Sequence, residues 1–237
     1  MLNGPIRPIQ ARAGIAMGRE VFQHSSVVQV AATTVATVSF ALVTWFFVSG
    51  PELDPWLFRF VDIGNNVWLE PVFGVGLCAV VLRQIDQGRT SVGTVFTLLR
   101  RSPAVIVMGA GLALVQDWPF YLLEYDESGS LSMPDLAAFF GSLVYMCAVN
   151  VLFIWSYPAF ADGHGPIESL RLSLRLTREN VLGSVGVALL FYLFLFVGAI
   201  ACGIGVVLTL PMATSMVVAT YRTAFRTETA RLEAVFD

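Results

Sequence analysis

The sequence predicts an all-α integral membrane protein with six transmembrane helices in three hairpins and both termini in the cytoplasm. Three observations lead to this prediction. Hydrophobic residues make up 56% of the 237 residues and charged residues only 13%, whereas soluble domains carry about 25% charged residues. The apolar residues gather in segments long enough to cross a bilayer, and the mean hydropathy is +0.73. Because the basic residues fall almost entirely on one side of those segments, we expect a single membrane domain over residues 1–237.

Six apolar segments are near the length of about 20 residues that a transmembrane helix needs. They cover residues 27–49, 67–82, 103–123, 134–160, 181–201 and 204–221. The last two lie in a stretch without charges, from Val181 to Tyr221, which as one helix would measure about 60 Å, twice the thickness of the hydrocarbon core. The chain is therefore expected to turn back at Cys202–Gly205, where glycine tolerates a tight turn. Pro211 is expected to kink the last span.

An amphipathic helix is expected before each hairpin, over about residues 8–24, 89–101 and 166–179. In the third of these, SLRLSLRLTREN, leucine alternates with the period of a β-strand. A strand beside lipid would leave its backbone groups unpaired, so we expect a helix that starts near Pro166. That helix carries three arginines at spacings of four and three, on one narrow face: Arg171, Arg175 and Arg178.

The arginines also predict the orientation of the chain. All 14 basic residues are arginine, and all except Arg59 lie on the side that both termini share. By the positive-inside rule that side is the cytoplasm. Four tryptophans near the opposite boundary are typical of interfacial anchors: Trp45, Trp56, Trp68 and Trp118. The first apolar run is longer than a signal-peptide core and has no A-x-A-like site, so we expect it to be retained as a span.

A regular spacing of similar segments indicates a threefold internal repeat. Setting Gly88 against Gly165 aligns GRTSVGTVFTLLRRSPAVIV with GPIESLRLSLRLTRENVLGS and places Arg101 opposite Arg178. One more step of the same length places His24 opposite Arg101. We therefore expect each repeat to consist of an amphipathic helix followed by a hairpin of two spans.

The C-terminal half resembles a known group of proteins. The stretch YPAFADGHGPIESLRLSLRLTREN, the charge-free hairpin and LPMATSMVVATYRTAFR are similar to small bacterial six-span membrane proteins of uncharacterised function. These are related to the membrane domain fused to some glycerophosphoryl diester phosphodiesterases. The features that carry the resemblance are Pro158, Phe160, Arg178, Asn180, Pro211, Tyr221 and Arg222. EPVFGVG and GRTSVGTVF resemble the first half of the same group. The resemblance implies a multi-pass fold in the bacterial inner membrane, and it carries over no phosphodiesterase activity.

No catalytic or metal-binding motif is present in the sequence. It has no nucleophile elbow, HExxH, P-loop or dinucleotide fingerprint. Cys78, Cys147 and Cys202 lie in apolar runs without ligand spacing, which is typical of small buried residues. His24 and His164 have no partner constellation in the sequence. We therefore expect neither an enzyme nor a cofactor.

Three polar residues within the predicted spans are candidate functional residues, because burying such groups in hydrocarbon costs free energy. They are Glu70, Asp117 and Asn150. Two interpretations of the carboxylates stay open. They form an acidic outer vestibule that attracts cations, or they are hydrated in the outer headgroup region, with one paired to Arg59. Asn150 is expected to hydrogen-bond to a neighbouring helix.

The arginines of the amphipathic segments form the other candidate site. They are Arg171, Arg175, Arg178, Arg100 and Arg101. One interpretation is that they fix the topology and anchor the chain at the interface. The other is that they bind lipid phosphates or a partner protein.

The sequence favours a non-catalytic role as an accessory or assembly subunit of a membrane complex, or as a lipid-interacting scaffold. The alternative is a transporter or channel for a small solute or lipid. Such a protein needs polar groups along a route through the midplane, and beyond Asn150 and a few threonines the sequence offers none. The expected partners are the bilayer and another membrane protein or a specific lipid, and nothing points to nucleic acid.

Overall fold

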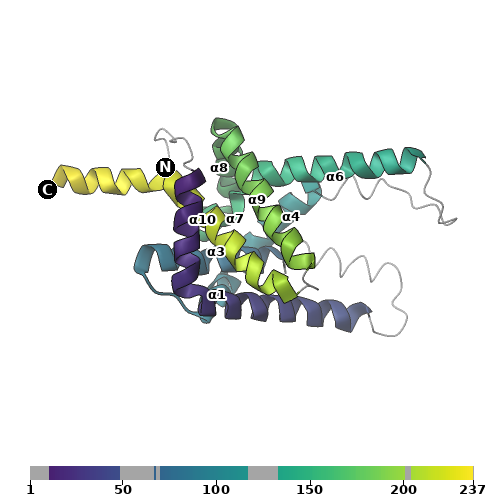
Figure 1. Cartoon of the computed structure of the whole chain (residues 1–237), viewed down its shortest axis with the longest axis horizontal. Helices are drawn as coiled ribbons and strands as arrows, with labels where there is room; N and C mark the ends of the chain where they lie inside the picture. The colour runs from purple at the N-terminus through teal and green to yellow at the C-terminus, as the bar shows by residue number, and fades with distance from the viewer. Residues whose placement is uncertain (1–10, 49–66, 68–69, 117–132, 201–203, 237) are drawn as a thin grey trace.

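The computed structural model describes residues 11–48, 67, 70–116, 133–200 and 204–236 (Figure 1). These residues form helices joined by short turns, without a strand among them, so the all-α class is confirmed. In chain order the helices are α1 (Ala11–Val48), α3 (Glu70–Gln87), the 3₁₀ helix η2 (Val92–Arg101), α4 (Ser102–Gln116), α6 (Met133–Phe153), α7 (Ser156–Ala161), α8 (Pro166–Glu179), α9 (Val181–Ile200) and α10 (Ile204–Phe236).

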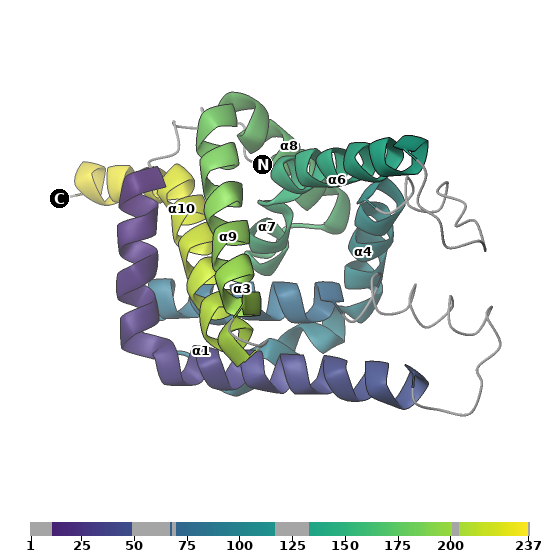
Figure 2. The same cartoon turned by 45° about the vertical axis from the view of Figure 1, so that its right-hand side comes forward.

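Each amphipathic segment meets the apolar helix that follows it at a break in the regular α-helix. In α1 the break is at Ser25, with φ −126° and ψ 18°. At Ser102 the 3₁₀ helix η2 gives way to α4, and Asn180, with φ −139° and ψ 49°, separates α8 from α9. Figure 2 shows the sharp bend of α1. Ser25, Ser102 and Asn180 are almost evenly spaced along the chain, with the period of the predicted repeat.

The first and third breaks are stabilised in the same way. The Ser25 hydroxyl donates a hydrogen bond to the carbonyl of Val21 at 2.7 Å. The Asn180 amide donates to the carbonyl of Leu176 at 3.3 Å. In both cases the acceptor lies four residues earlier, so the side chain bonds to the carbonyl that the backbone N–H of the same residue would reach in a regular helix.

The predicted span over residues 134–160 consists of two helices rather than one. The chain leaves α6 at Phe153 and enters α7 at Ser156. Pro158 explains the break, because a proline has no N–H to donate to the carbonyl of the residue four positions earlier, here Ile154. The carbonyl of Leu152, freed at the end of α6, accepts a hydrogen bond from Ser173 of α8 at 2.9 Å.

Helix α10 runs through Pro211 without a break, and the kink expected at this proline stays a prediction. One proline removes a single backbone hydrogen bond, and the buried position of Pro211 lets packing hold the helix together. Helix α9 ends at Ile200 and α10 begins at Ile204, and the turn predicted at Cys202–Gly205 falls mostly on residues 201–203, outside the described part of the chain.

The centre of the molecule is α3, which contacts α1, η2, α4, α7 and α10. Every residue from Pro71 to Leu82 is buried or half-buried there. The most extensive contact between two helices joins α1 to α10. Gly14 and Gly18 permit it, because a Cβ atom at Gly18 would lie 2.6 Å from the Cα atom of Met216. Glycines four residues apart are the usual signal for such close helix packing.

Candidate functional site

The C-terminal ends of two helices meet an arginine in the middle of a third. Asp86 lies near the end of α3, Asp162 directly follows α7, and Arg222 belongs to α10. The Arg222 Nε atom donates to Asp86 Oδ1 at 3.1 Å, and its Nη2 atom also pairs with Asp86 Oδ2. The same arginine also pairs with Asp162: its Nη1 atom donates to Asp162 Oδ2 at 3.0 Å, and its Nη2 atom lies 2.9 Å from Asp162 Oδ1. We call these three residues the Asp–Arg–Asp cluster.

Two glycines position the carboxylates of this cluster. Gly88 follows α3 with φ +67°, and Gly163 follows α7 with φ +106°. Only glycine adopts these left-handed conformations readily, so each helix stops there and the chain turns away. Asp86 and Asp162 lie one or two residues before those turns. Their carboxylates therefore stay at the helix ends, within reach of α10.

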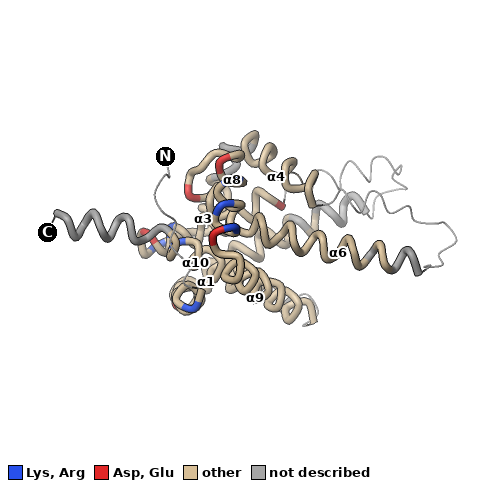
Figure 3. The backbone as a smooth tube through the Cα atoms, turned by 90° about the horizontal axis from the view of Figure 1, so that it is seen from above, with Lys and Arg blue, Asp and Glu red and all other residues tan. Residues whose placement is uncertain are grey.

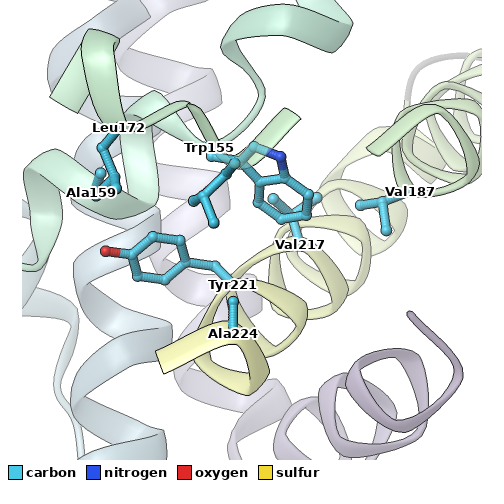
Figure 4. Packing of buried hydrophobic residues seen from close by; sticks show 8 residues of the cluster. Trp155, Ala159, Leu172, Val187, Val217, Tyr221 and Ala224 are labelled. Atoms are coloured by element: carbon cyan, nitrogen blue, oxygen red, sulfur yellow. The ribbon is translucent and has the colours of Figure 1, made fainter. Parts of the chain in front are cut away.

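The cluster continues into the apolar core through Tyr221. Its hydroxyl donates to Asp162 Oδ2 at 3.2 Å, while its ring is buried against Trp155 and Val217 (Figure 4). Trp155 is fixed in turn, because its Nε1 atom donates to the Ser184 hydroxyl of α9 at 3.0 Å. The Asp–Arg–Asp cluster is thus connected directly to the packed interior.

The Arg222 side chain is only 18% exposed, yet it is held in the charged form. Burial disfavours its charge, but the hydrogen bonds and negative charges of Asp86 and Asp162 outweigh that effect and raise the pKa of Arg222 above its usual value. A bidentate arrangement with planar carboxylates is the geometry that arginine satisfies and lysine does not. The cluster therefore acts as a permanent ionic tie between α3, α7 and α10.

A groove of about 320 Å³ lies beside the cluster, between α3, η2 and the end of α7. Its lining is Ala79, Leu82, Arg83, Asp86, Thr97, Ala161, Asp162 and Gly163. We call it the α3–α7 groove. Arg83 reaches towards η2, where its Nη1 atom lies 3.4 Å from the Thr94 hydroxyl. The groove therefore combines opposite charges with an apolar floor.

The predicted arginine face lies on α8, which is a helix despite its period-two leucines. Arg171, Arg175 and Arg178 are exposed on it. Its opposite face is buried and includes Leu172 and Leu176. Arg175 Nε also donates to Glu179 Oε1 at 3.0 Å, one turn further along the helix. The arginines thus form one charged, accessible surface.

The remaining predicted site residues lie apart from that face. Arg100 and Arg101 end η2, but their side chains are outside the described part of the structure, as is all of Asp117. Glu70 is exposed in the first turn of α3, where a carboxylate is favoured by the helix dipole. Asn150 Oδ1 accepts a hydrogen bond from Gln116 Nε2 of α4 at 2.8 Å, which links α6 to α4.

A second polar contact, not predicted from the sequence, lies inside the molecule at the bend of α1. Gln29 is buried, and its Nε2 atom donates to the Ser25 hydroxyl at 2.7 Å. Its Oε1 atom accepts from the hydroxyl of Ser215 in α10, also at 2.7 Å. The available signal was a glutamine near the start of a predicted span, where an amide usually bonds to a neighbouring helix.

No protein-family model matches the chain. No curated protein and no solved structure matches it either. The resemblance of the C-terminal half to six-span membrane proteins therefore stays a prediction, and the function is argued from the residues themselves.

The Asp–Arg–Asp cluster was also missed by sequence reasoning. Each of its members alone is an ordinary charge at the end of a predicted span. The signal was their common position, because each follows the second span of a predicted hairpin, and Asp86 and Asp162 are separated by almost one repeat. Among the described residues no group of His, Cys, Asp and Glu side chains is suited to hold a metal ion. The cluster instead joins helices and presents charge to the α3–α7 groove.

Proposed function

We propose that the chain is a non-catalytic integral membrane protein that serves as an accessory or assembly subunit of a membrane complex, or as a lipid-interacting scaffold. The observation that carries this proposal is the exposed apolar surface of α9. Leu182 is 90% exposed and Ile200 is 68% exposed, at opposite ends of a helix that is long and apolar enough to cross a membrane. A core helix of a soluble protein would bury these side chains, and such a surface in water would promote association.

A second apolar stretch also supports a location in a membrane. Residues Phe140–Ala161, which cover most of α6 and all of α7, are also long and apolar enough to cross a membrane. Phe140 and Val144 are exposed there. We infer that lipid covers both surfaces, because transfer of apolar side chains out of water is favourable in proportion to their area.

The proposed topology has six spans and places both termini in the cytoplasm. Charge placement supports it: α4 and α9 carry no charged residue, and apart from Glu70 the described charges lie on α8, near the C-terminal ends of α3 and α7, in the first half of α1 and at Arg222 of α10 (Figure 3). The cluster residues Asp86, Asp162 and Arg222 belong to this charged end. By the positive-inside rule it is the cytoplasmic end of a bacterial inner-membrane protein.

The scaffold role rests on α8. Its buried face holds the helix firmly, since Ser173 both accepts from the Trp155 amide at 3.1 Å and donates to the Leu152 carbonyl. Its exposed arginine face, Arg171 to Arg178, is then available to lipid phosphates or to an acidic partner. The second candidate function, a lipid or small-solute transporter, is favoured by the α3–α7 groove.

The experiment that tests the proposal is gentle extraction of the natively expressed protein, followed by mass spectrometry of everything that co-purifies in constant ratio. We expect a protein partner or a specific lipid. We also expect its loss when Arg171, Arg175 and Arg178 are all changed to Gln, and its retention in the control variant Asn150→Leu. Release of the chain from membranes by an alkaline carbonate wash would contradict the proposal, as would recovery of the protein with nothing bound.

A further inference from the structure

The lining of the α3–α7 groove carries both signs of charge. Among the described lining residues are the guanidinium of Arg83 and the carboxylates of Asp86 and Asp162. Arg222, which pairs with both carboxylates, compensates one of their two negative charges. Within the described lining, the cluster therefore presents one net negative charge beside the positive charge of Arg83. The complementary ligand is a zwitterion with a cationic group for the carboxylates and an anionic group for the arginine.

The groove favours an organic ammonium over a metal ion as the cationic group. A divalent metal takes several acidic or imidazole ligands, and the described residues offer no such group of three. An ammonium differs because it donates hydrogen bonds, and a carboxylate has about four acceptor positions. Arg222 and Tyr221 occupy only part of that capacity.

The described lining also favours a primary ammonium over a quaternary one. Proteins recognise quaternary ammonium groups with aromatic side chains, and the described residues that line the groove include none. A primary ammonium presents three N–H donors, which match the carboxylate oxygens of Asp86 and Asp162. The anionic group meets Arg83, for which a phosphate is a strong partner.

We propose that the α3–α7 groove binds a phosphoethanolamine group, with the ammonium on Asp86 and Asp162 and the phosphate on Arg83. Ala79, Leu82 and Ala161 give the groove an apolar floor, and they lie on helices that the proposed function places at the membrane. The ligand is therefore a phospholipid with this headgroup. The inference rests on the proposed membrane function and names the lipid class that it uses.

The test uses the full-length protein, purified in detergent free of phospholipid, with binding measured by titration calorimetry. Three probes show whether the groove recognises the ammonium N–H groups and the acyl chains. They are dihexanoyl phosphatidylethanolamine, dihexanoyl phosphatidylcholine and glycerophosphoethanolamine, which has no acyl chains. We expect the phosphatidylethanolamine to bind at least about tenfold more tightly than the phosphatidylcholine, because methylation removes the N–H donors. Equal binding of these two lipids would overturn the proposal.

A pair of arginine variants tests the phosphate contact. Arg83→Gln should weaken binding of the phosphatidylethanolamine by about tenfold, as expected for loss of one charge-assisted contact. Arg89→Gln is the matched control, because Arg89 is exposed and outside the groove lining, and it should leave binding unchanged. Equal affinity of the two variants, with both folded by circular dichroism, would refute the role of Arg83.

The third probe distinguishes a lipid from a soluble ester. Tighter binding of the lipid than of glycerophosphoethanolamine supports a lipid site, while equal binding refutes a lipid site in favour of one for the soluble headgroup. The proposed membrane function is tested separately, by carbonate extraction. A chain that resists carbonate extraction but binds both lipids equally refutes only the groove proposal, whereas a chain that leaves the membrane refutes the proposed function.

Discussion

Arg222 and Asp162 form a two-point ion pair, with nitrogen-to-oxygen distances of 2.9 and 3.0 Å, across 60 residues of sequence. The same guanidinium reaches Asp86, so one side chain connects three helices. Each of these helices ends a different predicted hairpin. The ion pairs of Arg222 therefore join the three predicted repeats to one another. Their removal should lower the stability of the whole helix bundle.

Arg222→Gln should lower the free energy of unfolding by about 1–3 kcal/mol. The change leaves two carboxylates close together without their shared counter-charge, which is costly where they are partly buried. The value lies below that of a fully buried pair because the side chains of Asp162 and Asp86 are 22% and 42% exposed. Thermal unfolding in detergent measures the effect. Arg89→Gln is the control, and a similar small loss in both variants would show that the cluster does not stabilise the fold.

Gly18→Ala should destabilise the protein, and Gly186→Ala should not. A Cβ atom at Gly18 would meet the α10 backbone at 2.6–2.8 Å, whereas one at Gly186 has no heavy atom within 4 Å. Overpacking of this kind costs about 1–3 kcal/mol, while removal of glycine from a helix interior gains up to about 1 kcal/mol. Opposite signs in the midpoint of thermal unfolding are expected. The same sign in both variants would mean that α1 and α10 do not pack this closely.

Gln29→Leu and Ser215→Ala should each destabilise the protein by about 1–3 kcal/mol, because each leaves a buried polar partner without its hydrogen bond. The double variant removes both polar groups and should cost less than the sum of the two single changes. Thr34→Ala is a suitable control, since Thr34 bonds within its own helix and is exposed. Strict additivity in the double-mutant cycle would show that these side chains do not interact.

Ser173→Ala should cost about 1–3 kcal/mol by removing two hydrogen bonds at the break between α6 and α7. The Ser173 hydroxyl accepts from the Trp155 amide and donates to the Leu152 carbonyl. Because both backbone groups lie where the helix is interrupted, neither has a regular helical partner. Native-state hydrogen exchange at the Trp155 amide measures the effect. Unchanged protection of that amide would contradict the assigned hydrogen bond.

Local patterns in the sequence predicted the helices well. A stretch without charges predicts α9 by its composition, and the arginine spacing with Pro166 predicts α8. The internal repeat indicated where the amphipathic segments meet the apolar ones, and the breaks at Ser25 and Asn180 follow it. These features depend on residues that are close together in the sequence, so they can be predicted from the sequence alone.

The tertiary features were harder to predict. The cluster joins residues as far as 136 positions apart, and no periodicity indicates which charges at the helix ends will meet. The break before Trp155 depends on one proline acting four residues upstream. Gln29 could have been noticed as a polar residue in an apolar segment, but its partner Ser215 follows only from the packing of α1 on α10.

The most direct test of the central proposal, a multi-pass membrane protein with its charged end in the cytoplasm, is labelling of introduced cysteines with a membrane-impermeant maleimide. In a background where Cys78, Cys147 and Cys202 are alanine, Ser128→Cys probes the predicted outer connection. Arg89→Cys probes the charged end. We predict that intact spheroplasts label position 128 alone and that permeabilised ones label both. Labelling of position 89 in intact spheroplasts, at the rate of position 128, would contradict the proposed topology.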